Sequence, residues 1–525
     1  MLTGSRLFQC VALLALSSIA GPVWGQDSLV VKTDKGKVEG SLTKDGKVRA
    51  FRGIPFAAPP IGDLRWREPQ PAAKWDGVRS TKAYGAHCVQ NPVFEDMLFH
   101  DPGPSEDCLT LNVWAPVGAK PGSLPVMVWV YGGGYQGGST SENRQDGEFL
   151  ARKDVVVVTM NYRMGIFGFF VHPELTAESP HHASGNYGLQ DQAAALAWVS
   201  KNIEGFGGNP KNVTLFGESA GSFSVSALMA SPLSRGLIAK GIGESGGALP
   251  GARGGWSTLK EREERDSAFA QAAYGTSKLS ELRQMTTEDI LRATGPKAMP
   301  KSPGFSPEVD GYFMPKPVEE IYAAGEQAHV PLLAGWNTNE GGKPKTTAAD
   351  FREKAKTEFG DDTPKFLEVY KAGTDEEAQD SAIDLAADRF IAFGTWRWIE
   401  AQVKTGGSPV YRYHFELPNP GDRFHKVESG AFHSDEIEYV FGALDGRPEM
   451  KIRPEDRAVS ELMSLYWTNF AKKSDPNGPG LPKWGAYSAA DDWQVMHINV
   501  ESESKPDMHR GRYLFLQEHW GKPKS

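Results

Sequence analysis

Cysteine is scarce in this sequence: Cys10, Cys88 and Cys108 are the three among 525 residues. So few cysteines exclude a small scaffold held by disulfides, and no histidine cluster lies near them that would suggest a zinc site. Blocks of basic residues are also missing, and the 57 Lys and Arg against 66 Asp and Glu give a net charge of −9. We therefore expect no nucleic-acid partner, and so mild an acidity indicates no particular substrate.

Long apolar runs are missing after the N-terminus. Arg6 is the only charge before Asp27, and residues 7–20 between them are mostly apolar but too short for a comfortable membrane span. Small residues at the offsets of a cleavage site follow a Gly-Pro pair and end at Gly25. This order predicts that residues 1–25 form a secretory signal peptide. The remaining protein is expected to be soluble, without a membrane span, and secreted or periplasmic.

Short apolar runs alternate with a helical pattern along the chain. Uninterrupted apolar segments predict buried strands, here at residues 124–131, 155–162, 212–216 and 332–334. Residues 190–203 have apolar side chains at helical spacing. Strand, helix and strand in sequence indicate an α/β fold with a large, mostly parallel central sheet and helices on both faces. The charged segments 259–293 and 348–399 are expected to be helical insertions. No break in composition divides residues 26–525, so a single domain is expected.

The pattern Gly-x-Ser-x-Gly occurs twice, around Ser219 and around Ser245. Small residues in this pattern allow a strand to turn sharply into a helix with the serine at the apex. Ser219 follows the predicted strand at 212–216 and precedes a plausible helix start, whereas the glycines and the proline after Ser245 cannot continue as a helix. Ser219 is therefore the expected nucleophile. Ser245 is expected to be a buried hydroxyl that supports the site, or a turn residue.

A glycine-rich loop is expected to hold the negative charge that forms on a reacting carbonyl. The residue after the nucleophile, Ala220, supplies one backbone N–H. Gly132, Gly133 and Gly134 follow the predicted strand at 124–131, where any side chain would block the approach of a substrate carbonyl. A phosphate-binding loop is the other option for such glycines, but the Lys-Ser/Thr signature of that loop does not follow.

These motifs, with other segments, resemble the type-B carboxylesterases of the α/β-hydrolase superfamily, the group that also contains the cholinesterases. The matching segments extend over nearly the whole mature chain: 51–57 (FRGIPFA), 106–113 (EDCLTLNV), 161–163 (NYR), 185–192 (GNYGLQDQ), 216–221 (FGESAG), 469–472 (NFAK) and 475–477 (DPN). The resemblance implies an α/β-hydrolase fold and the hydrolysis of carboxylic esters.

The resemblance also implies roles for individual residues near the nucleophile. Gly133 and Gly134 would donate to the oxyanion beside Ala220. Glu218, directly before Ser219, looks like the family's buried glutamate, whose role here would be electrostatic and structural.

Two further positions bear on the resemblance. The family joins two cysteines at this place by a disulfide, which here means Cys88 and Cys108, and two cysteines in an oxidising compartment would most simply pair in any case. Tyr131 precedes the three glycines where many relatives have histidine. Because the oxyanion hole is made of backbone, this change is expected to leave activity in place and to affect only the rim of the pocket.

The base and the acid must follow the nucleophile, since α/β-hydrolases have the order serine, acid, histidine along the chain. Among the later histidines, His433 lies in segment 431–436 (AFHSDE), which resembles the family's histidine loop. His414 lies in an alternating strand at 410–417 and is expected to be a packed or paired strand residue.

The acid orients the imidazole of the base and stabilises its charged form. Glu340 lies in segment 337–342 (NTNEGG), directly after the predicted strand at 332–334, and this segment resembles the family's acid loop. The runner-up is Asp310, whose other interpretation is a turn or pocket-edge residue. We expect Glu340 to be the acid.

The sequence thus predicts a secreted serine carboxylic ester hydrolase that acts on a small-molecule ester through an acyl-serine intermediate, with no metal or organic cofactor. Two alternatives stay open. The family includes catalytically inactive binding proteins. The same triad can also hydrolyse other acyl bonds, such as lactones or amides. Nothing in the sequence selects a particular ester or an oligomeric state.

Overall fold

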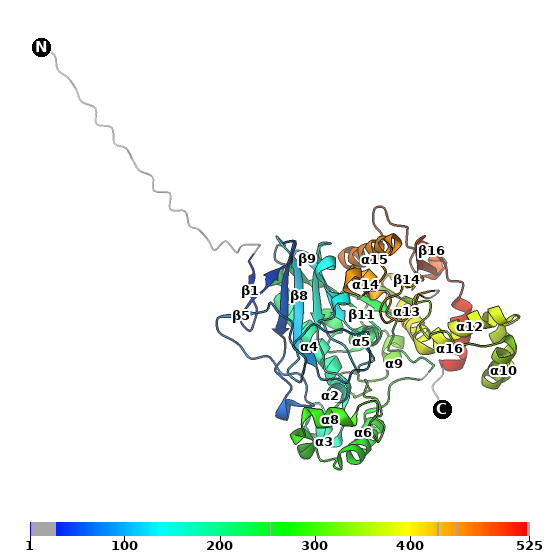
Figure 1. Ribbon diagram of the computed structural model, residues 1–525, viewed down its shortest axis with the longest axis horizontal. Helices are drawn as coiled ribbons and strands as arrows, with labels where there is room; N and C mark the ends of the chain where they lie inside the picture. Colours follow the sequence, from blue (N-terminus) through cyan, green and yellow to red (C-terminus); the bar gives the residue numbers. More distant parts are fainter. Residues whose placement is uncertain (2–27, 253, 428–429, 448, 522–525) are drawn as a thin grey trace.

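The computed structural model describes residue 1 and residues 28–521, except 253, 428–429 and 448. Within these residues the central element is an eleven-stranded sheet with the order β16-β15-β14-β13-β12-β11-β9-β10-β8-β4-β3 (Figure 1). The predicted signal peptide lies outside the described residues, apart from Met1, and so does its cleavage point near Gly25.

The middle of the sheet is parallel and its two ends are antiparallel. The parallel strands are β10 (Val156–Met160), β9 (Leu124–Val130), β11 (Gly208–Glu218), β12 (Lys240–Glu244), β13 (Leu332–Asn337), β14 (Val410–Phe415) and β15 (Gln494–Ile498). The antiparallel strands are β8 (Thr110–Pro116), β4 (Val48–Pro55), β3 (Ser41–Leu42) and β16 (Glu503–Pro506). The predicted α/β class with a mostly parallel sheet is confirmed.

Uninterrupted apolar runs form the central strands because both faces of the sheet are covered. Residues 126–130 of β9 and 156–160 of β10 are fully buried, at 0% exposure. Outside this sheet, β1 (Val30–Lys32) pairs with β2 (Lys37–Glu39), which pairs with β5 (Val78–Ser80), and β6 (His87–Cys88) pairs with β7 (Pro104–Ser105).

Neighbouring residues of β12 point to opposite faces and so identify the helices that cover each face. Glu244 accepts a hydrogen bond from Trp467 of α15 (Pro454–Lys473), which also contacts α14 (Ile437–Phe441). A Cβ added to the preceding Gly243 would instead meet Trp398 of α13 (Phe393–Thr405) and Ser222 of α5 (Ala220–Ala230). On the α5 side lie also α4 (Tyr187–Asn202) and α9 (Val318–Ala323), which contact α5.

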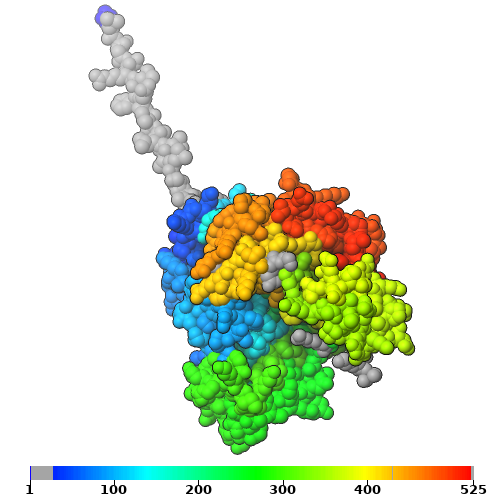
Figure 2. All heavy atoms as spheres, turned by 45° about the vertical axis from the view of Figure 1, so that its right-hand side comes forward, coloured from blue at the N-terminus to red at the C-terminus, as the bar shows by residue number. Residues whose placement is uncertain are grey.

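Two groups of helices are inserted between strands, as predicted for residues 259–293 and 348–399. Between β12 and β13 lie α6 (Leu259–Tyr274), α7 (Leu279–Gln284) and α8 (Thr287–Ala293). Between β13 and β14 lie α10 (Ala348–Phe359), α11 (Thr363–Val369), α12 (Asp375–Ala387) and α13, and a π-helical turn at Asp388–Ala392 joins α12 to α13. Figure 2 shows the first group in green and the second in yellow-green as two separate projections of the surface.

The remaining helices and the disulfide complete the fold. The helices are α1 (Glu148–Ala151), α2 (Gly165–Phe169), α3 (Pro173–Glu178) and α16 (Arg510–Trp520). Cys88 and Cys108 form the predicted disulfide bond, with their Cα atoms 5.0 Å apart. In the part of the chain that the structure describes, every helix is too short or too polar to cross a membrane.

Candidate active site

Ser219 stands at a sharp turn between β11 and α5, with a backbone φ of 54°. Glycines on both sides make this turn possible. A Cβ on Gly221 would lie 1.9 Å from the carbonyl oxygen of Val130, and a Cβ on Gly217 would lie 2.6 Å from the same oxygen. Because no real Cβ comes so close, only glycine allows β11 and α5 to pack against β9 with the serine between them.

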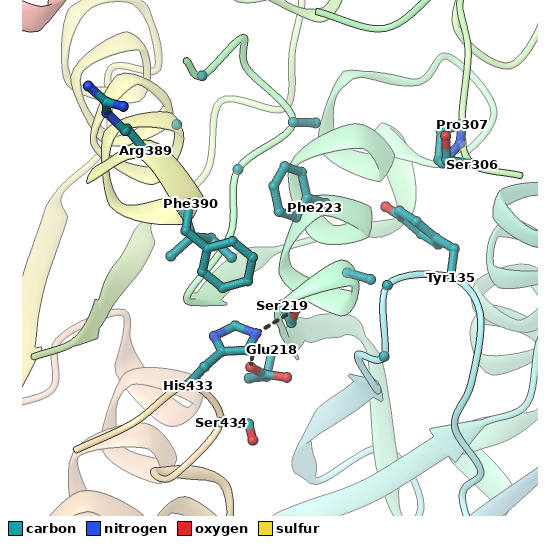
Figure 3. A pocket seen from close by; sticks show the side chains of 18 of the residues that line it. Tyr135, Glu218, Ser219, Phe223, Ser306, Pro307, Arg389, Phe390, His433 and Ser434 are labelled. Carbon is teal, nitrogen blue, oxygen red and sulfur yellow. Dashed lines mark hydrogen bonds and ion pairs between the residues drawn. The ribbon is translucent and has the colours of Figure 1, made fainter. Parts of the chain in front are cut away.

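Three side chains from distant parts of the sequence form one chain of hydrogen bonds, part of which is visible in Figure 3. His433 Nε2 lies 2.8 Å from Ser219 Oγ, and His433 Nδ1 lies 2.5 Å from Glu340 Oε2. With its proton on Nδ1, the imidazole donates to the carboxylate and accepts from the serine. The structure therefore brings together the residues that the sequence predicts as nucleophile, base and acid.

Backbone and side-chain hydrogen bonds join the loop that carries the carboxylate to the loop that carries the imidazole. The N–H of Asn339 donates to the carbonyl of Ala431 at 2.8 Å, and the N–H of Ala431 donates to Thr338 Oγ1 at 2.8 Å. Asn337 Nδ2 donates to the carbonyl of Phe432 at 2.7 Å. These three bonds join the residues just before Glu340 to those just before His433, and so hold the two members of the ion pair close together.

The second oxygen of the Glu340 carboxylate is also held. Glu340 Oε1 accepts from the N–H of Asn337 at 2.8 Å and from Ser245 Oγ at 2.5 Å. Of the two predictions for Ser245, the structure agrees with a buried hydroxyl in contact with the site, and the residue also lies in a turn, at φ 54°. Glu436 lies beside this group, with Oε2 2.6 Å from Asn337 Nδ2. Glu436 is the last residue of the segment 431–436 that resembles the family's histidine loop, but the resemblance implied no role for it.

Two carboxylates flank the imidazole. Glu218 Oε1 lies 3.2 Å from His433 Nε2, on the side opposite Glu340. Burial raises the pKa of Glu218 to about 8, although the charge of His433 opposes this. Burial acts to lower the pKa of His433, but the charges of Glu218 and Glu340 outweigh it and raise that pKa above its ordinary value. A positive charge on the imidazole is therefore strongly stabilised here.

The three residues expected to bind the oxyanion line the same cavity as Ser219: Gly133, Gly134 and Ala220. Gly133 has φ 101° and Gly134 has φ 62°, in the region that favours glycine. A Cβ on Gly133 would lie 2.0 Å from the carbonyl oxygen of Gly137. The conformation of this loop thus requires glycine independently of any ligand.

Tyr131 lies beneath this loop rather than at the rim of the pocket. Its side chain is 2% exposed and stacks on Tyr162, with ring centroids 4.7 Å apart. Tyr162 Oη donates to the Tyr131 carbonyl at 2.8 Å. The expected effect of Tyr131 on the pocket rim is therefore wrong, and the phenol instead supports the start of the glycine loop from below.

The cavity over Ser219 has a volume of about 680 Å³ and is lined mainly by apolar side chains. In Figure 3, Phe223 of α5 and Phe390 of the π-helical turn lie above Ser219 and His433, and all four residues line the cavity. The Phe390 ring meets the His433 ring edge-on, with centroids 5.0 Å apart. Other apolar residues of the wall are Phe94, Met97, Tyr135, Leu249, Trp256 and Ile391.

Two alternative candidates from the sequence lie elsewhere. Asp310 Oδ1 accepts the N–H groups of Tyr312 at 3.0 Å and Met314 at 2.8 Å, so this carboxylate holds its own turn. His414 Nδ1 lies 3.0 Å from Glu416 Oε1, so this histidine is a paired strand residue, as expected.

Comparisons with known proteins identify the family and agree with the fold. The model of the carboxylesterase family matches residues 27–515. The fumonisin B1 esterase of Sphingopyxis macrogoltabida is 37% identical over 492 residues, which cover 89% of this chain and 87% of that protein. The cocaine esterase of Homo sapiens is 34% identical, with 91% of this chain and 89% of that protein covered.

A solved structure agrees as well. A PNB esterase superposes with a TM-score of 0.77 at 31% identity, over 94% of this chain and 99% of that chain. The chain belongs to the carboxylesterase family, has its α/β-hydrolase fold and is a carboxylic ester hydrolase.

Proposed function

We propose that this protein is an exported serine esterase in which Ser219 is the nucleophile, His433 the base and Glu340 the acid. The single observation that carries the proposal is the unbroken chain of hydrogen bonds from Ser219 Oγ through both imidazole nitrogens to Glu340, at the floor of an apolar cavity. A serine hydroxyl is a weak nucleophile by itself, and this arrangement supplies the base that it requires.

In the first step, Ser219 Oγ attacks the ester carbonyl carbon and its proton passes to His433 Nε2. The carbonyl oxygen becomes negative and accepts hydrogen bonds from the backbone N–H groups of Gly133, Gly134 and Ala220. When the tetrahedral intermediate collapses, the bond to the alcohol oxygen breaks and His433 gives its proton to that oxygen. The alcohol leaves, and an ester between the acyl group and Ser219 remains.

In the second step, His433 takes a proton from a water molecule, whose oxygen attacks the acyl carbon. The bond from that carbon to Ser219 Oγ then breaks, and the proton on His433 returns to the serine. Glu340 stays ionised throughout and stabilises the imidazolium in both steps. Ser245 holds Glu340, and Glu218 adds negative charge on the other side of the ring above pH 8, where it is ionised. The carboxylic acid leaves and the free enzyme is restored.

The proposed substrates are esters with an apolar part that fits the cavity, such as short alkyl and aryl esters. Support comes from the aromatic walls formed by Phe223 and Phe390 and from the cavity volume of about 680 Å³, which suits a small molecule. The similarity to a fumonisin B1 esterase adds esters of such a toxin as candidates. The relatives' names differ in substrate, so the substrate must be found by a screen.

Export is part of the proposal. It is supported by the signal-like residues 1–25 and by the disulfide between Cys88 and Cys108, since disulfides persist in oxidising compartments. The N-terminal sequence of the protein recovered from the periplasm and from the medium tests this point. Export predicts a new N-terminus near residue 26, and an intact Met1 in all fractions would contradict it.

The central test compares hydrolysis of p-nitrophenyl esters of increasing acyl length by the wild type and by Ser219→Ala. The variant is expected to lose turnover by about 10³-fold or more while keeping its fold. A serine-reactive organophosphate should label the wild type and leave the variant unlabelled. Retention of most activity in a folded Ser219→Ala protein would overturn the assignment of the nucleophile.

A further inference from the structure

Two histidines and a glutamate gather on the C-terminal part of the sheet, apart from the residues of the active site. Among the described residues, His414, Glu416 and His497 form a group in which one nitrogen or oxygen from each lies within 4.8 Å of those of the others. No sequence motif contains all three residues, because His497 lies 81 residues after Glu416.

The backbone holds the three residues in a fixed arrangement. His414 in β14 and His497 in β15 are direct partners in parallel strands. Glu416 lies two residues after His414 and therefore projects to the same side of the extended chain. Its N–H donates to the carbonyl of Ile498 at 2.9 Å, so the pairing of the two strands continues through this position.

Both imidazoles point at one carboxylate oxygen. Glu416 Oε1 lies 2.5 Å from His497 Nδ1 and 3.0 Å from His414 Nδ1. Burial acts to raise the pKa of Glu416, but hydrogen bonds from His414 and His497 outweigh it and lower that pKa to about 2. The three side chains are between 22% and 28% exposed, so an ion from solvent can reach them.

Nearby positive charge is already compensated. Lys505 of β16 acts electrostatically with Glu416, but its Nζ forms an ion pair with Glu503 at 2.5 Å. Glu503 is the direct strand partner of His497. The negative charge of this neighbour also favours a cation beside His497.

We propose that His414, Glu416 and His497 bind one divalent transition-metal ion of the zinc class. Imidazole nitrogen with carboxylate oxygen is a donor set that suits zinc, and three protein ligands leave a further position for water. Bonds of about 2.0–2.1 Å place neighbouring ligand atoms about 3.3 Å apart. Glu416 Oε1, now 2.5 Å and 3.0 Å from the two Nδ1 atoms, would move away from them by less than about 1 Å. The two imidazole nitrogens, which lie within 4.8 Å of each other, would adjust to the same spacing. The ion would replace the hydrogen bonds within the group and join β14 to β15.

This proposal is independent of the proposed catalytic function, and its test must separate the two sites. The active site also contains a histidine between two glutamates, Glu218 and Glu340, which could bind added metal. The probe is Zn²⁺ titrated into metal-stripped, tag-free full-length protein, followed by calorimetry. Co²⁺ titrated in parallel gives an absorption spectrum that reports the ligands.

The wild type is expected to bind one Zn²⁺, and His414→Asn, Glu416→Gln and His497→Asn are each expected to weaken binding by at least about tenfold. His433→Asn in the active site and His329→Asn elsewhere on the surface serve as matched controls and should bind as the wild type does. Ester hydrolysis in metal-free buffer shows which ligand variants are folded. Since three variants are available, the loss of one to misfolding does not decide the result.

Two results would overturn the proposal. One is the absence of Zn²⁺ binding by the wild type at 1:1 stoichiometry. The other is wild-type affinity for Zn²⁺ in the folded ligand variants. Loss of binding in His433→Asn at the same time would show that the metal occupies the active site instead.

Discussion

Ser219 and Ser245 have the same backbone φ, 54°, and follow neighbouring parallel strands whose last residues, Glu218 and Glu244, are direct partners. The same five-residue pattern therefore follows a strand twice and gives its serine the same positive φ each time. The Ser219 hydroxyl faces the cavity and His433, whereas Ser245 is fully buried and donates to the carboxylate behind the imidazole. One turn supplies the proposed nucleophile and the other holds the acid.

Ser245→Ala should lower kcat by about tenfold, because Glu340 loses one charge-assisted hydrogen bond but keeps the N–H of Asn337. The measurement is kcat for a p-nitrophenyl ester, with organophosphate labelling, which should persist. Ser460→Ala is the control, since this buried serine donates to the Tyr439 carbonyl away from the site. A loss as large as that of Ser219→Ala would make Ser245 a rival nucleophile.

Glu340→Gln should lower kcat by about 10²- to 10⁴-fold with little change in KM, because the imidazolium loses its counter-charge and its orientation. Asp310→Asn tests the competing candidate in the same assay. Its Oδ1 can still accept the two N–H groups of its turn, so we expect nearly wild-type turnover. The opposite pattern, in which folded Asp310→Asn is inactive and Glu340→Gln is active, would mean that Asp310 and not Glu340 is the acid.

The pH dependence of activity tests the pair of Glu218 and His433. The base works only as neutral imidazole, so activity rises with pH through the pKa of His433, which the two flanking carboxylates raise. Glu218→Gln removes one of these charges and lowers that pKa. The acid limb of kcat/KM should therefore move to lower pH, by about one unit.

The control for this shift is Glu461→Gln, which removes an exposed glutamate paired with Lys153 and should leave the profile unchanged. The measurement is kcat/KM from pH 5 to 11, a range that includes the raised pKa of His433 of about 10, corrected for spontaneous hydrolysis. An acid limb that stays in place, or that moves to higher pH, would exclude Glu218 as a source of the raised pKa.

Phe390→Ala should shift selectivity toward longer acyl chains, because Phe390 forms part of the cavity wall and contacts the imidazole ring. We expect the ratio of kcat/KM for octanoyl and acetyl esters to rise by about tenfold. Leu514→Ala, which removes an exposed apolar side chain of α16, is the control. An unchanged ratio would mean that the ring does not contact the acyl group.

The disulfide should contribute about 3 kcal/mol to the free energy of unfolding, since it closes a loop between residues 20 positions apart. The variant with Cys88→Ser and Cys108→Ser is expected to unfold at lower urea concentration than the oxidised wild type. Reduced wild type should match the variant. Equal midpoints for oxidised wild type and variant would show that the bond adds no stability.

The central strands and the turn at Ser219 could be predicted from the sequence, because runs of apolar residues and short glycine motifs determine them. The apolar run at 124–131 became β9, and the choice of Ser219 over Ser245 followed from the helix that starts at Ala220. The helix predicted at 190–203 begins earlier, at Tyr187, since the apolar spacing does not mark its first turn. The first and last residues of a helix depend on contacts with other segments, and the spacing of apolar residues does not reveal those contacts.

Other parts of the site depend on contacts between distant segments. Ser245 could be identified as a supporting hydroxyl or a turn residue, but its bond to Glu340 arises from the order of β12 and β13 in the sheet. The resemblance implied no role for Glu436, no motif contains Phe390, and both reach the site only through the fold. Tyr131 is buried because it stacks on Tyr162, and that contact joins the segments that follow β9 and β10.

The π-helical turn at Asp388–Ala392 has a consequence for how such an enzyme can diverge. A π turn holds one more residue than an α turn, so the deletion of a single codon there could restore regular α-helix. Each residue of an α-helix turns by about 100°, and Phe390 would be carried away from the cavity by such a change. The sheet, the nucleophile and the base would keep their places. Substrate range in this lineage can therefore be altered by the length of one helical turn, without any substitution among the residues proposed to carry out the reaction.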